Sequence, residues 1–320
     1  MIGLVEIERA RARIARLLRA TPLVESVWLS RAAHAEVRLK LESTQVSCSF
    51  KARGALNAIA RLREEAPHVS HVVTASAGNH GRAIAWAASL WSLQSTVFTP
   101  RSAPAAKLDA IREHGANLRD ECDDYEDAEA RGREYAREHA ATFISPYNHE
   151  DVIAGGGTVG LEILEAWPEV DTVLVPIGGG GLISGIAVAV KAAAHHRVEV
   201  VGVEAEASQA FTAARHAGRI VPVKVSPSIA DGLGGNVEHD TMTWPYIRDL
   251  VDRIVTVTED DLRATIRQLV ARDHLVAEGA GAAAPAAAAS GRSGIQGRRA
   301  AAILSGANID LQKLTAVIAE

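Results

Sequence analysis

The sequence contains little of what many binding and structural proteins depend on. Only two cysteines occur among its 320 residues, Cys48 and Cys122, and they do not form a C-x-x-C pair. This number excludes a disulfide scaffold and favours a reducing cytoplasm. Aromatic residues make up only 4% of the chain, which argues against the stacking surfaces that bind single-stranded nucleic acid.

Excess positive charge and long apolar runs are also missing. The chain has 34 Lys and Arg against 39 Asp and Glu, a net charge of −5, so we expect neither nucleic acid nor an anionic membrane as a partner. No apolar run approaches the roughly 18 residues of a membrane span. Glu6 and Glu8 stand where a signal peptide would be apolar. We therefore expect a soluble cytoplasmic protein.

What the sequence does contain is a regular alternation of apolar, β-rich segments with helical patterns. Strand-like segments occur at residues 36–41, 71–74, 95–99, 172–177, 198–203, 253–257 and 301–304. Such alternation predicts an α/β protein whose twisted sheets are parallel or mostly parallel and flanked by helices. The length fits about two domains.

A run of four glycines at residues 178–181 follows one of these strands and precedes a helix. Glycines let backbone N–H groups approach an anion closely, and the start of the helix adds a partial positive charge, so a phosphate is the natural guest. No Gly-Lys-Ser/Thr follows, which excludes a Walker loop. The spacing Gly179-x-Gly181-x-x-Ser184, with Glu204 further along, leaves a dinucleotide site open.

Three further segments carry polar groups next to predicted strands or helices. Lys51 lies at the start of a helix, where its charge opposes the helix dipole unless the amine is neutral or covalently bound. Residues 76–81 form a loop of small and polar residues suited to a carboxylate. Ser305 ends a strand, where a hydroxyl can bind a ring nitrogen or cap the next helix.

Four ordered motifs together are far more specific than any one of them. They are Ser49-Phe50-Lys51-Ala52-Arg53-Gly54-Ala55, Ser76-Ala77-Gly78-Asn79-His80-Gly81, the tetraglycine, and Glu278-Gly279-Ala280-Gly281. With them the chain resembles the pyridoxal-phosphate β-family of the tryptophan-synthase fold type, in the branch of serine/threonine dehydratases and serine racemases. The resemblance covers nearly the whole chain.

This resemblance implies an organisation in two domains. We predict a small domain at residues 71–147, inserted into a large domain formed by residues 1–70 and 148–320. Pyridoxal 5′-phosphate (PLP) is expected in the cleft between them, and a homodimer is expected as the assembly.

The resemblance also assigns roles to individual residues. Lys51 matches the lysine that holds the cofactor covalently, and Phe50 is expected near the cofactor ring. Asn79 matches the partner of the ring 3′ oxygen, and Ser305 matches the partner of the pyridine nitrogen. The phosphate site corresponds to Gly178, Gly179, Gly180 and Gly181. Substrate-binding positions correspond to Ser76, Ala77, Gly78, His80 and Asn148.

The chain departs from the family pattern at several positions. Cys48 and Gly156 stand where the family usually has Gly and Gln. The family's divalent-ion site uses a Glu and an Asp six positions later. Glu204 fits the first, but Ala210 occupies the second, so Glu204 is a possible ligand and no metal site is predicted with it. Racemases of this branch carry Ser where Ala77 stands, which argues against racemisation.

The predicted function is a PLP-dependent lyase of amino-acid catabolism. It would convert a β-hydroxy amino acid, L-threonine or L-serine first, to a 2-oxo acid and ammonia by α,β-elimination. Two PLP alternatives stay open: a dehydratase of 3-hydroxyaspartate or phenylserine, and a β-replacement enzyme, against which His80 counts because those enzymes usually have Thr there. The alternatives without PLP are a nucleotide-binding oxidoreductase and a catalytically silent binding module.

Overall fold

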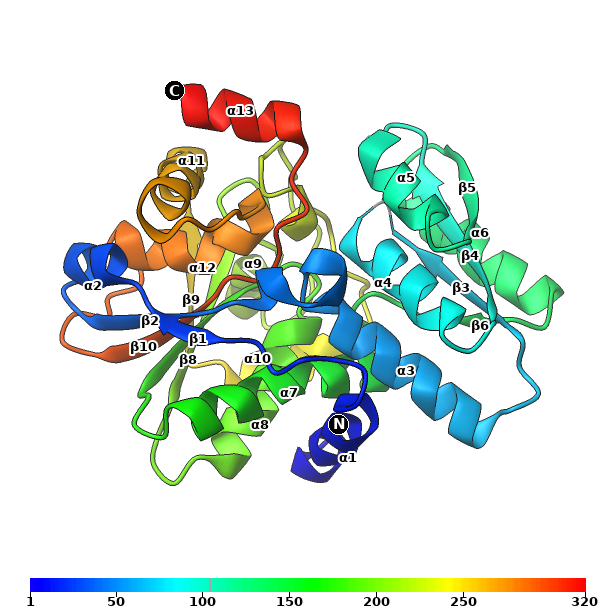
Figure 1. Cartoon of the computed structure of the whole chain (residues 1–320), viewed down its shortest axis with the longest axis horizontal. Coiled ribbons are helices and arrows are strands. Elements are labelled where there is room, and N and C mark those ends of the chain that lie inside the picture. Colours follow the sequence, from blue (N-terminus) through cyan, green and yellow to red (C-terminus); the bar gives the residue numbers. More distant parts are fainter. Residues whose placement is uncertain (77, 104) are drawn as a thin grey trace.

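The computed structural model describes residues 1–76, 78–103 and 105–320, and the strands in those ranges form a larger and a smaller sheet (Figure 1). The larger sheet has the strand order β1 (Leu23–Glu25), β2 (Glu36–Lys40), β10 (Arg299–Ile303), β7 (Thr172–Pro176), β8 (Glu199–Ala205) and β9 (Arg253–Val257). The smaller sheet has the order β5 (Asn117–Cys122), β4 (Gln94–Pro100), β3 (His71–Ala75) and β6 (Thr142–Phe143).

Nearly all strand pairs of the two sheets are parallel. The exception is the antiparallel pair β1–β2 at the edge of the larger sheet. The predicted fold class, an α/β protein with mostly parallel sheets, is therefore confirmed. The strands of the smaller sheet all fall between residues 71 and 143, and those of the larger sheet come from both sides of that segment. The exact domain boundaries remain predictions.

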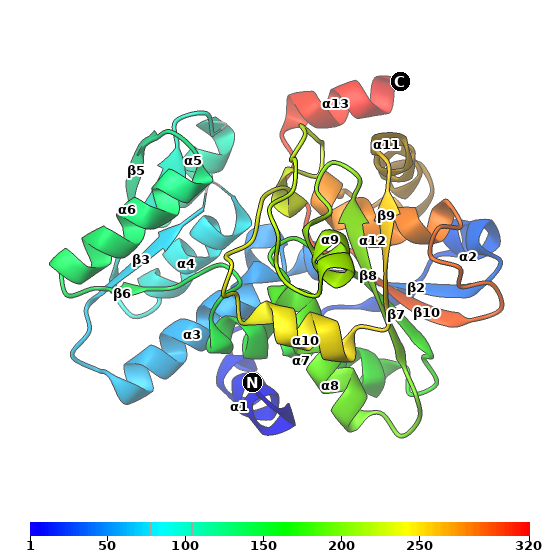
Figure 2. The same ribbon diagram turned by 180° about the vertical axis from the view of Figure 1, so that it is seen from behind.

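Helices cover both faces of the larger sheet (Figures 1 and 2). One buried cluster joins the sheet to α2 (Val27–Ala33), α11 (Glu259–Gln268) and α12 (Gly279–Ala289). A second joins the opposite face to α7 (Glu150–Ala166), α8 (Gly181–Ala193), α9 (Ala210–Ala217) and α10 (Thr243–Leu250). The remaining helices near this sheet are α1 (Leu4–Ile14), α3 (Lys51–Glu65) and α13 (Leu311–Ala319).

The smaller sheet carries helices α4 (Asn79–Ser89), α5 (Ala105–Arg112) and α6 (Tyr125–Glu138). Short helical turns occur at Glu42–Thr44, Val46–Cys48 and Asp231–Leu233, and a π-helical turn at Leu269–Asp273. No helix within the described ranges has the length and apolar character needed to cross a membrane.

The local sequence explains the most deeply buried elements. β7 is a continuous apolar run with every residue buried, which is the pattern of a strand covered on both faces. α12 consists almost entirely of alanine and glycine, and Gly279 to Ala288 are all buried. Its small side chains allow the helix to pack closely on the sheet, and Pro285 lies within it.

Helix α3 links the two sheets and packs against both α7 and α4. Its crossing with α7 is very close: a Cβ atom on Gly54 would lie 2.8 Å from the carbonyl oxygen of Val152, and one on Gly155 would lie 2.5 Å from that of Arg53. Only glycine permits this approach. The crossing fixes the first turn of α3, where Lys51 lies.

Candidate active site

Two of the four motifs, and Ser305, follow directly after strands of the two sheets. The tetraglycine follows β7, Ser305 follows β10, and the loop before Asn79 follows β3. The backbone N–H of Phe50 donates to the carbonyl oxygen of Ser305 at 3.1 Å, so the start of α3 lies beside the end of β10. Carboxyl ends of parallel strands are the usual place for a ligand in such sheets.

Lys51 is the first residue of α3, and its side chain is half-buried. Its Nζ donates a hydrogen bond to the carbonyl oxygen of Pro146 at 2.7 Å and lies 5.1 Å from the centre of the Phe50 ring. Burial lowers the pKa of Lys51 to about 8, although the nearby Glu278 carboxylate acts in the opposite direction. A neutral, nucleophilic amine is therefore accessible close to neutral pH.

The tetraglycine forms a tight turn into α8. Gly180 precedes the helix with φ +87°, a left-handed conformation that favours glycine, and this residue has no side chain to cap the helix. A Cβ atom on Gly179 would lie 2.3 Å from ring atoms of Tyr147. Tyr147 follows Pro146, whose carbonyl oxygen binds Lys51, so this short segment connects the lysine to the glycine turn.

Asn79, at the start of α4, joins the smaller sheet's helices to the segments that hold Glu278 and Asn308. Its Nδ2 donates to Oε1 of Glu278 at 2.6 Å, and its Oδ1 accepts from Nδ2 of Asn308 at 2.6 Å. Burial raises the pKa of Glu278 to about 7, while the hydrogen bond from Asn79 opposes the rise. Glu278 stands out in the sequence only as part of a motif, and nothing in that motif indicates this contact. The signal available was a lone acidic residue before an otherwise apolar run.

The predicted substrate positions in the loop around Asn79 make hydrogen bonds of different kinds. Ser76 accepts a hydrogen bond at its Oγ from the Gly78 N–H at 3.2 Å. His80 is buried, its Nε2 lies 3.2 Å from the carbonyl oxygen of Ile144, and its Nδ1 has no partner among the described residues. Burial lowers the pKa of His80 well below its usual range. This shift favours the neutral form of the imidazole.

Asn148 and Ser305 are two further predicted positions, of which Asn148 forms side-chain hydrogen bonds and Ser305 is buried. Asn148 binds a loop of the larger part: its Nδ2 donates to Glu238 Oε2 at 2.7 Å, and its Oδ1 accepts from the Met242 N–H at 2.9 Å. Ser305 is buried, with 4% of its surface exposed. Ala77 lies outside the described residues.

Comparisons with known proteins assign the family. The sequence pattern described as "Pyridoxal-phosphate dependent enzyme" matches residues 14–306. An L-threonine ammonia-lyase of Thermotoga maritima is 37% identical over 318 residues, covering 99% of this chain and 78% of that protein. The chain belongs to the pyridoxal-phosphate-dependent enzyme family.

Other members of the family give the same picture. The catabolic L-threonine dehydratase of Escherichia coli is also 37% identical over 318 residues, covering 99% of this chain and 96% of that one. The solved structure of maize serine racemase matches with a TM-score of 0.92 at 33% identity, covering 99% of this chain and 97% of that one. The predicted resemblance and the PLP cofactor are therefore confirmed.

The residues present fit the cofactor of this family. The uncapped helix start behind a glycine turn leaves backbone N–H groups for a phosphate. The Oγ of Ser184, in the first turn of α8, is buried without a partner in the described part of the chain. Lys51, with its lowered pKa, fits the covalent attachment of an aldehyde.

Glu204 is bound within the protein. Its carboxylate accepts from the backbone N–H groups of Phe211 and Thr212 and from the Thr212 hydroxyl, at 2.6 to 3.0 Å. Both carboxylate oxygens therefore hold the start of α9. Within residues 1–76, 78–103 and 105–320, no three His, Cys, Asp or Glu side chains gather as metal ligands would.

Cys48, one of the departures from the family pattern, has an unfavourable backbone conformation. It has φ +55°, and Ser47 before it has φ +64°, so both occupy the left-handed region. A non-glycine residue there costs roughly 1–2 kcal/mol, which gives a physical reason for the glycine usual in this family. The exposed thiol of Cys48 thus lies on a strained turn three residues before Lys51.

Arg53, in the first turn of α3, forms a buried network of ion pairs. Its guanidinium is buried and donates to both oxygens of Glu42, at 2.7 and 2.9 Å, and to both oxygens of Glu162, at 2.6 and 2.8 Å. Lys40 donates to Glu162 as well, at 2.5 Å. Burial alone would raise the pKa of Glu162, but the hydrogen bonds and charge of Arg53 outweigh it and lower the pKa.

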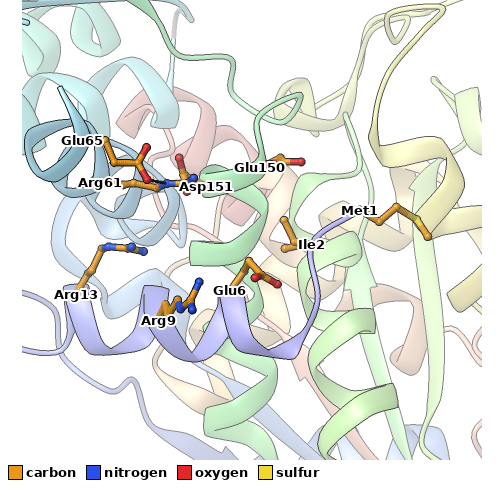
Figure 3. A pocket seen from close by; sticks show the side chains of 9 residues that line it. All are labelled: Met1, Ile2, Glu6, Arg9, Arg13, Arg61, Glu65, Glu150 and Asp151. Carbon is orange, nitrogen blue, oxygen red and sulfur yellow. Dashed lines mark hydrogen bonds and ion pairs between the residues drawn. The ribbon is translucent and has the colours of Figure 1, made fainter.

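A surface hollow of about 330 Å³ lies apart from this centre, between α1, α3 and the start of α7 (Figure 3). Its rim carries mixed charges, and Arg61 there is bound to Glu65 and Asp151. The hollow contains none of the predicted site residues. Its lining is Met1, Ile2, Glu6, Arg9, Arg13, Arg61, Glu65, Glu150 and Asp151.

Proposed function

We propose that this enzyme is a dehydratase, or ammonia-lyase, of β-hydroxy amino acids, with L-threonine and L-serine as the first substrates to test. The observation that carries this proposal is the placement of Lys51, a half-buried residue with a lowered pKa. Its amine binds the carbonyl oxygen of Pro146, and the adjacent Tyr147 packs on the glycine turn. The names of the relatives that are 37% identical over nearly the whole chain support it. The net reaction yields one 2-oxo acid and one ammonia.

Four groups of this chain would hold the cofactor. Lys51 would hold its aldehyde carbon, the tetraglycine its phosphate, Asn79 its ring oxygen and Ser305 its ring nitrogen. When bound, PLP withdraws electrons from the α-carbon of the amino acid and so makes the α-proton acidic.

Lys51 is then the base that removes this proton. A pKa of about 8 keeps a useful fraction of its amine neutral near neutral pH. The β-hydroxyl leaves as water, and later hydrolysis releases ammonia and the 2-oxo acid. Ser76, Gly78 and His80 border this place and are proposed to receive the substrate carboxylate.

Ser305 influences which reaction follows. The neutral hydroxyl of Ser305 would not keep a pyridine nitrogen protonated as a carboxylate would. Ser305 would therefore favour prompt loss of the β-hydroxyl over transamination.

Release of 2-oxo acid across a panel of β-hydroxy amino acids tests the proposal. We expect turnover with L-threonine or L-serine, and the panel should include 3-hydroxyaspartate and phenylserine. A protein that binds PLP but releases 2-oxo acid from none of them is not such a dehydratase. The predicted homodimer and cytoplasmic location are separate expectations that this assay leaves untested.

Racemisation is a second candidate, because maize serine racemase is similar over nearly its full length. It requires an acid on the face of the α-carbon opposite Lys51, and the methyl group of Ala77 cannot supply a proton. We expect L-serine to give mainly pyruvate and little D-serine. Chiral chromatography of a partly consumed reaction measures both, and D-serine forming as fast as pyruvate would contradict this prediction.

Replacing Gly179 by alanine should weaken cofactor retention. The new Cβ atom would lie 2.3 Å from the Tyr147 ring, so either the ring or the phosphate-binding turn must move. Such overpacking costs about 1–3 kcal/mol, and we expect cofactor affinity to fall roughly tenfold. Cofactor absorbance after dialysis measures this.

Gly3→Ala is the matched control. A Cβ atom on Gly3 meets its nearest atom, Glu6 Oε2, at 3.4 Å, which is an ordinary contact. Its cofactor occupancy should equal that of the unmodified protein. Equal occupancy in Gly179→Ala would remove the tetraglycine from the phosphate site.

A further inference from the structure

Glu278 has an unusual environment for a carboxyl group. It is 6% exposed, and within the described ranges no Lys, Arg or His nitrogen lies within 4 Å of it. It immediately precedes α12, a position from which side chains often cap a helix, yet it makes no capping hydrogen bond. Its hydrogen bond to Asn79 instead reaches across to the first residue of α4. Helix capping therefore does not account for this buried acid.

The hydrogen bonds behind Asn79 have only one consistent orientation. The Arg82 guanidinium can only donate, and its Nη1 lies 2.9 Å from Oδ1 of Asn308. The carbonyl oxygen of Ser47 can only accept, and it lies 2.8 Å from Nδ2 of Asn308. These two contacts fix the amide of Asn308, whose second Nδ2 hydrogen then faces Oδ1 of Asn79.

The orientation of Asn79 follows from that of Asn308. Because its Oδ1 accepts from Asn308, its NH₂ group must face Glu278. One of the two N–H bonds is used by the Glu278 carboxyl oxygen. The other has no acceptor among the described residues and can donate, which is what binding a ring oxygen requires.

We propose that Glu278 is a positioning residue: together with Asn308, it holds the Asn79 amide with its second N–H directed at the ring oxygen of PLP. This inference rests on the proposed role of Asn79. Glu278 need not touch cofactor or substrate for this purpose. A rotated Asn79 would present its carbonyl oxygen to the ring oxygen, and two acceptors would then face each other.

Three variants test the role of Glu278. Glu278→Ala removes the acceptor, so we expect the visible absorption band of the bound cofactor to shift and kcat to fall about tenfold with a smaller change in KM. Glu278→Gln keeps an acceptor oxygen in the same place, so the band and kcat should stay close to those of the unmodified enzyme. Asn308→Asp replaces one NH₂ by an oxygen that cannot donate to Asn79, and should reproduce the effects of Glu278→Ala.

Thr258→Ala is the structural control. Thr258 caps α11 and accepts from the Asp261 N–H at 3.2 Å, so its loss should lower thermal stability without moving the cofactor band. An unshifted band and an unchanged kcat in Glu278→Ala overturn the proposal, as does a Gln variant impaired as much as the Ala variant. Should Glu278→Ala fail to fold, the nearly isosteric Asn308→Asp decides.

The spectrum separates this inference from the proposed function, because the cofactor band needs no substrate. Unmodified protein that binds PLP but releases no 2-oxo acid refutes the proposed function only. The band of the variants still decides the role of Glu278. The double variant Glu278→Ala with Asn308→Asp should add little to either single change, because both act on one amide.

Discussion

Lys51→Ala should abolish 2-oxo acid release, with a fall of roughly 10³-fold or more, while the fold remains intact. The substitution removes the amine that lies 2.7 Å from the carbonyl oxygen of Pro146. It also removes the group that would hold the cofactor covalently. Borohydride reduction followed by mass spectrometry should find the cofactor mass on Lys51 in the unmodified protein and no such adduct in the variant.

Lys224→Ala is the matched control, because Lys224 is exposed on a loop and belongs to no part of the proposed site. It should keep full turnover and a normal adduct at Lys51. Circular dichroism should show native secondary structure in both variants. If Lys51→Ala retained wild-type 2-oxo acid release, Lys51 would be neither the cofactor lysine nor the base.

The lowered pKa of Lys51 predicts a pH dependence as well. Only the neutral amine attacks an aldehyde, and its fraction grows as the pH rises through about 8. The rate at which cofactor-free protein takes up PLP covalently should therefore rise through that pH. A rate that rose only near the ordinary pKa of 10.5 would show that the amine is not buried in solution.

Arg53→Met should destabilise the protein strongly. It removes the cation that binds all four carboxylate oxygens of Glu42 and Glu162. Removing one partner of a buried ion pair costs about 3–5 kcal/mol. The buried Glu42 carboxylate loses its charged partner, and Glu162 keeps Lys40. Urea unfolding followed by circular dichroism gives the change in the free energy of unfolding.

Arg61→Met on the same helix provides the comparison. Arg61 pairs with Glu65 and Asp151, but a third of its side chain is exposed. Ion pairs of this kind contribute about 0–1 kcal/mol. Arg53→Lys, which keeps a charge without the fork geometry, should fall between the two. Equal stability losses in the Arg53 and Arg61 variants would mean that the buried network contributes no more than a surface pair.

The strand pattern of the sequence predicted most of the larger sheet. The segments predicted at residues 172–177, 253–257 and 301–304 correspond to β7, β9 and β10 within two residues at either end. β7 and β10 are buried apolar runs, and β9 is a half-buried strand at the sheet edge. Three strands were not predicted. β1 and β6 contain three and two residues, too few for a periodic pattern, and β5 reads Asn-Leu-Arg-Asp-Glu-Cys, in which charged residues obscure the alternation.

The site was predictable where its chemistry depends on unusual residues in a fixed order. Lys51 before a helix, four glycines after a strand and Asn79 in a polar loop all carry such a signal. The contacts that orient these residues carry no such signal in the sequence. Glu278 is 199 positions from Asn79 in the sequence, and no local pattern indicates that this acid turns away from its own helix. Likewise, Arg53 looks like one of many helical arginines until the fold brings Glu42 and Glu162 to it.

The position of β10 in the larger sheet has a consequence for how the chain folds during synthesis. β10 lies between β2 and β7 and pairs with both, so β2 lacks its parallel neighbour until residue 303 has been made. Every strand of the smaller sheet is complete at residue 143. At about 5–20 residues per second, the ribosome leaves β2 without that neighbour for on the order of ten seconds or more. The smaller sheet can form first, and the larger sheet closes last, when the final strand enters between two that were made long before.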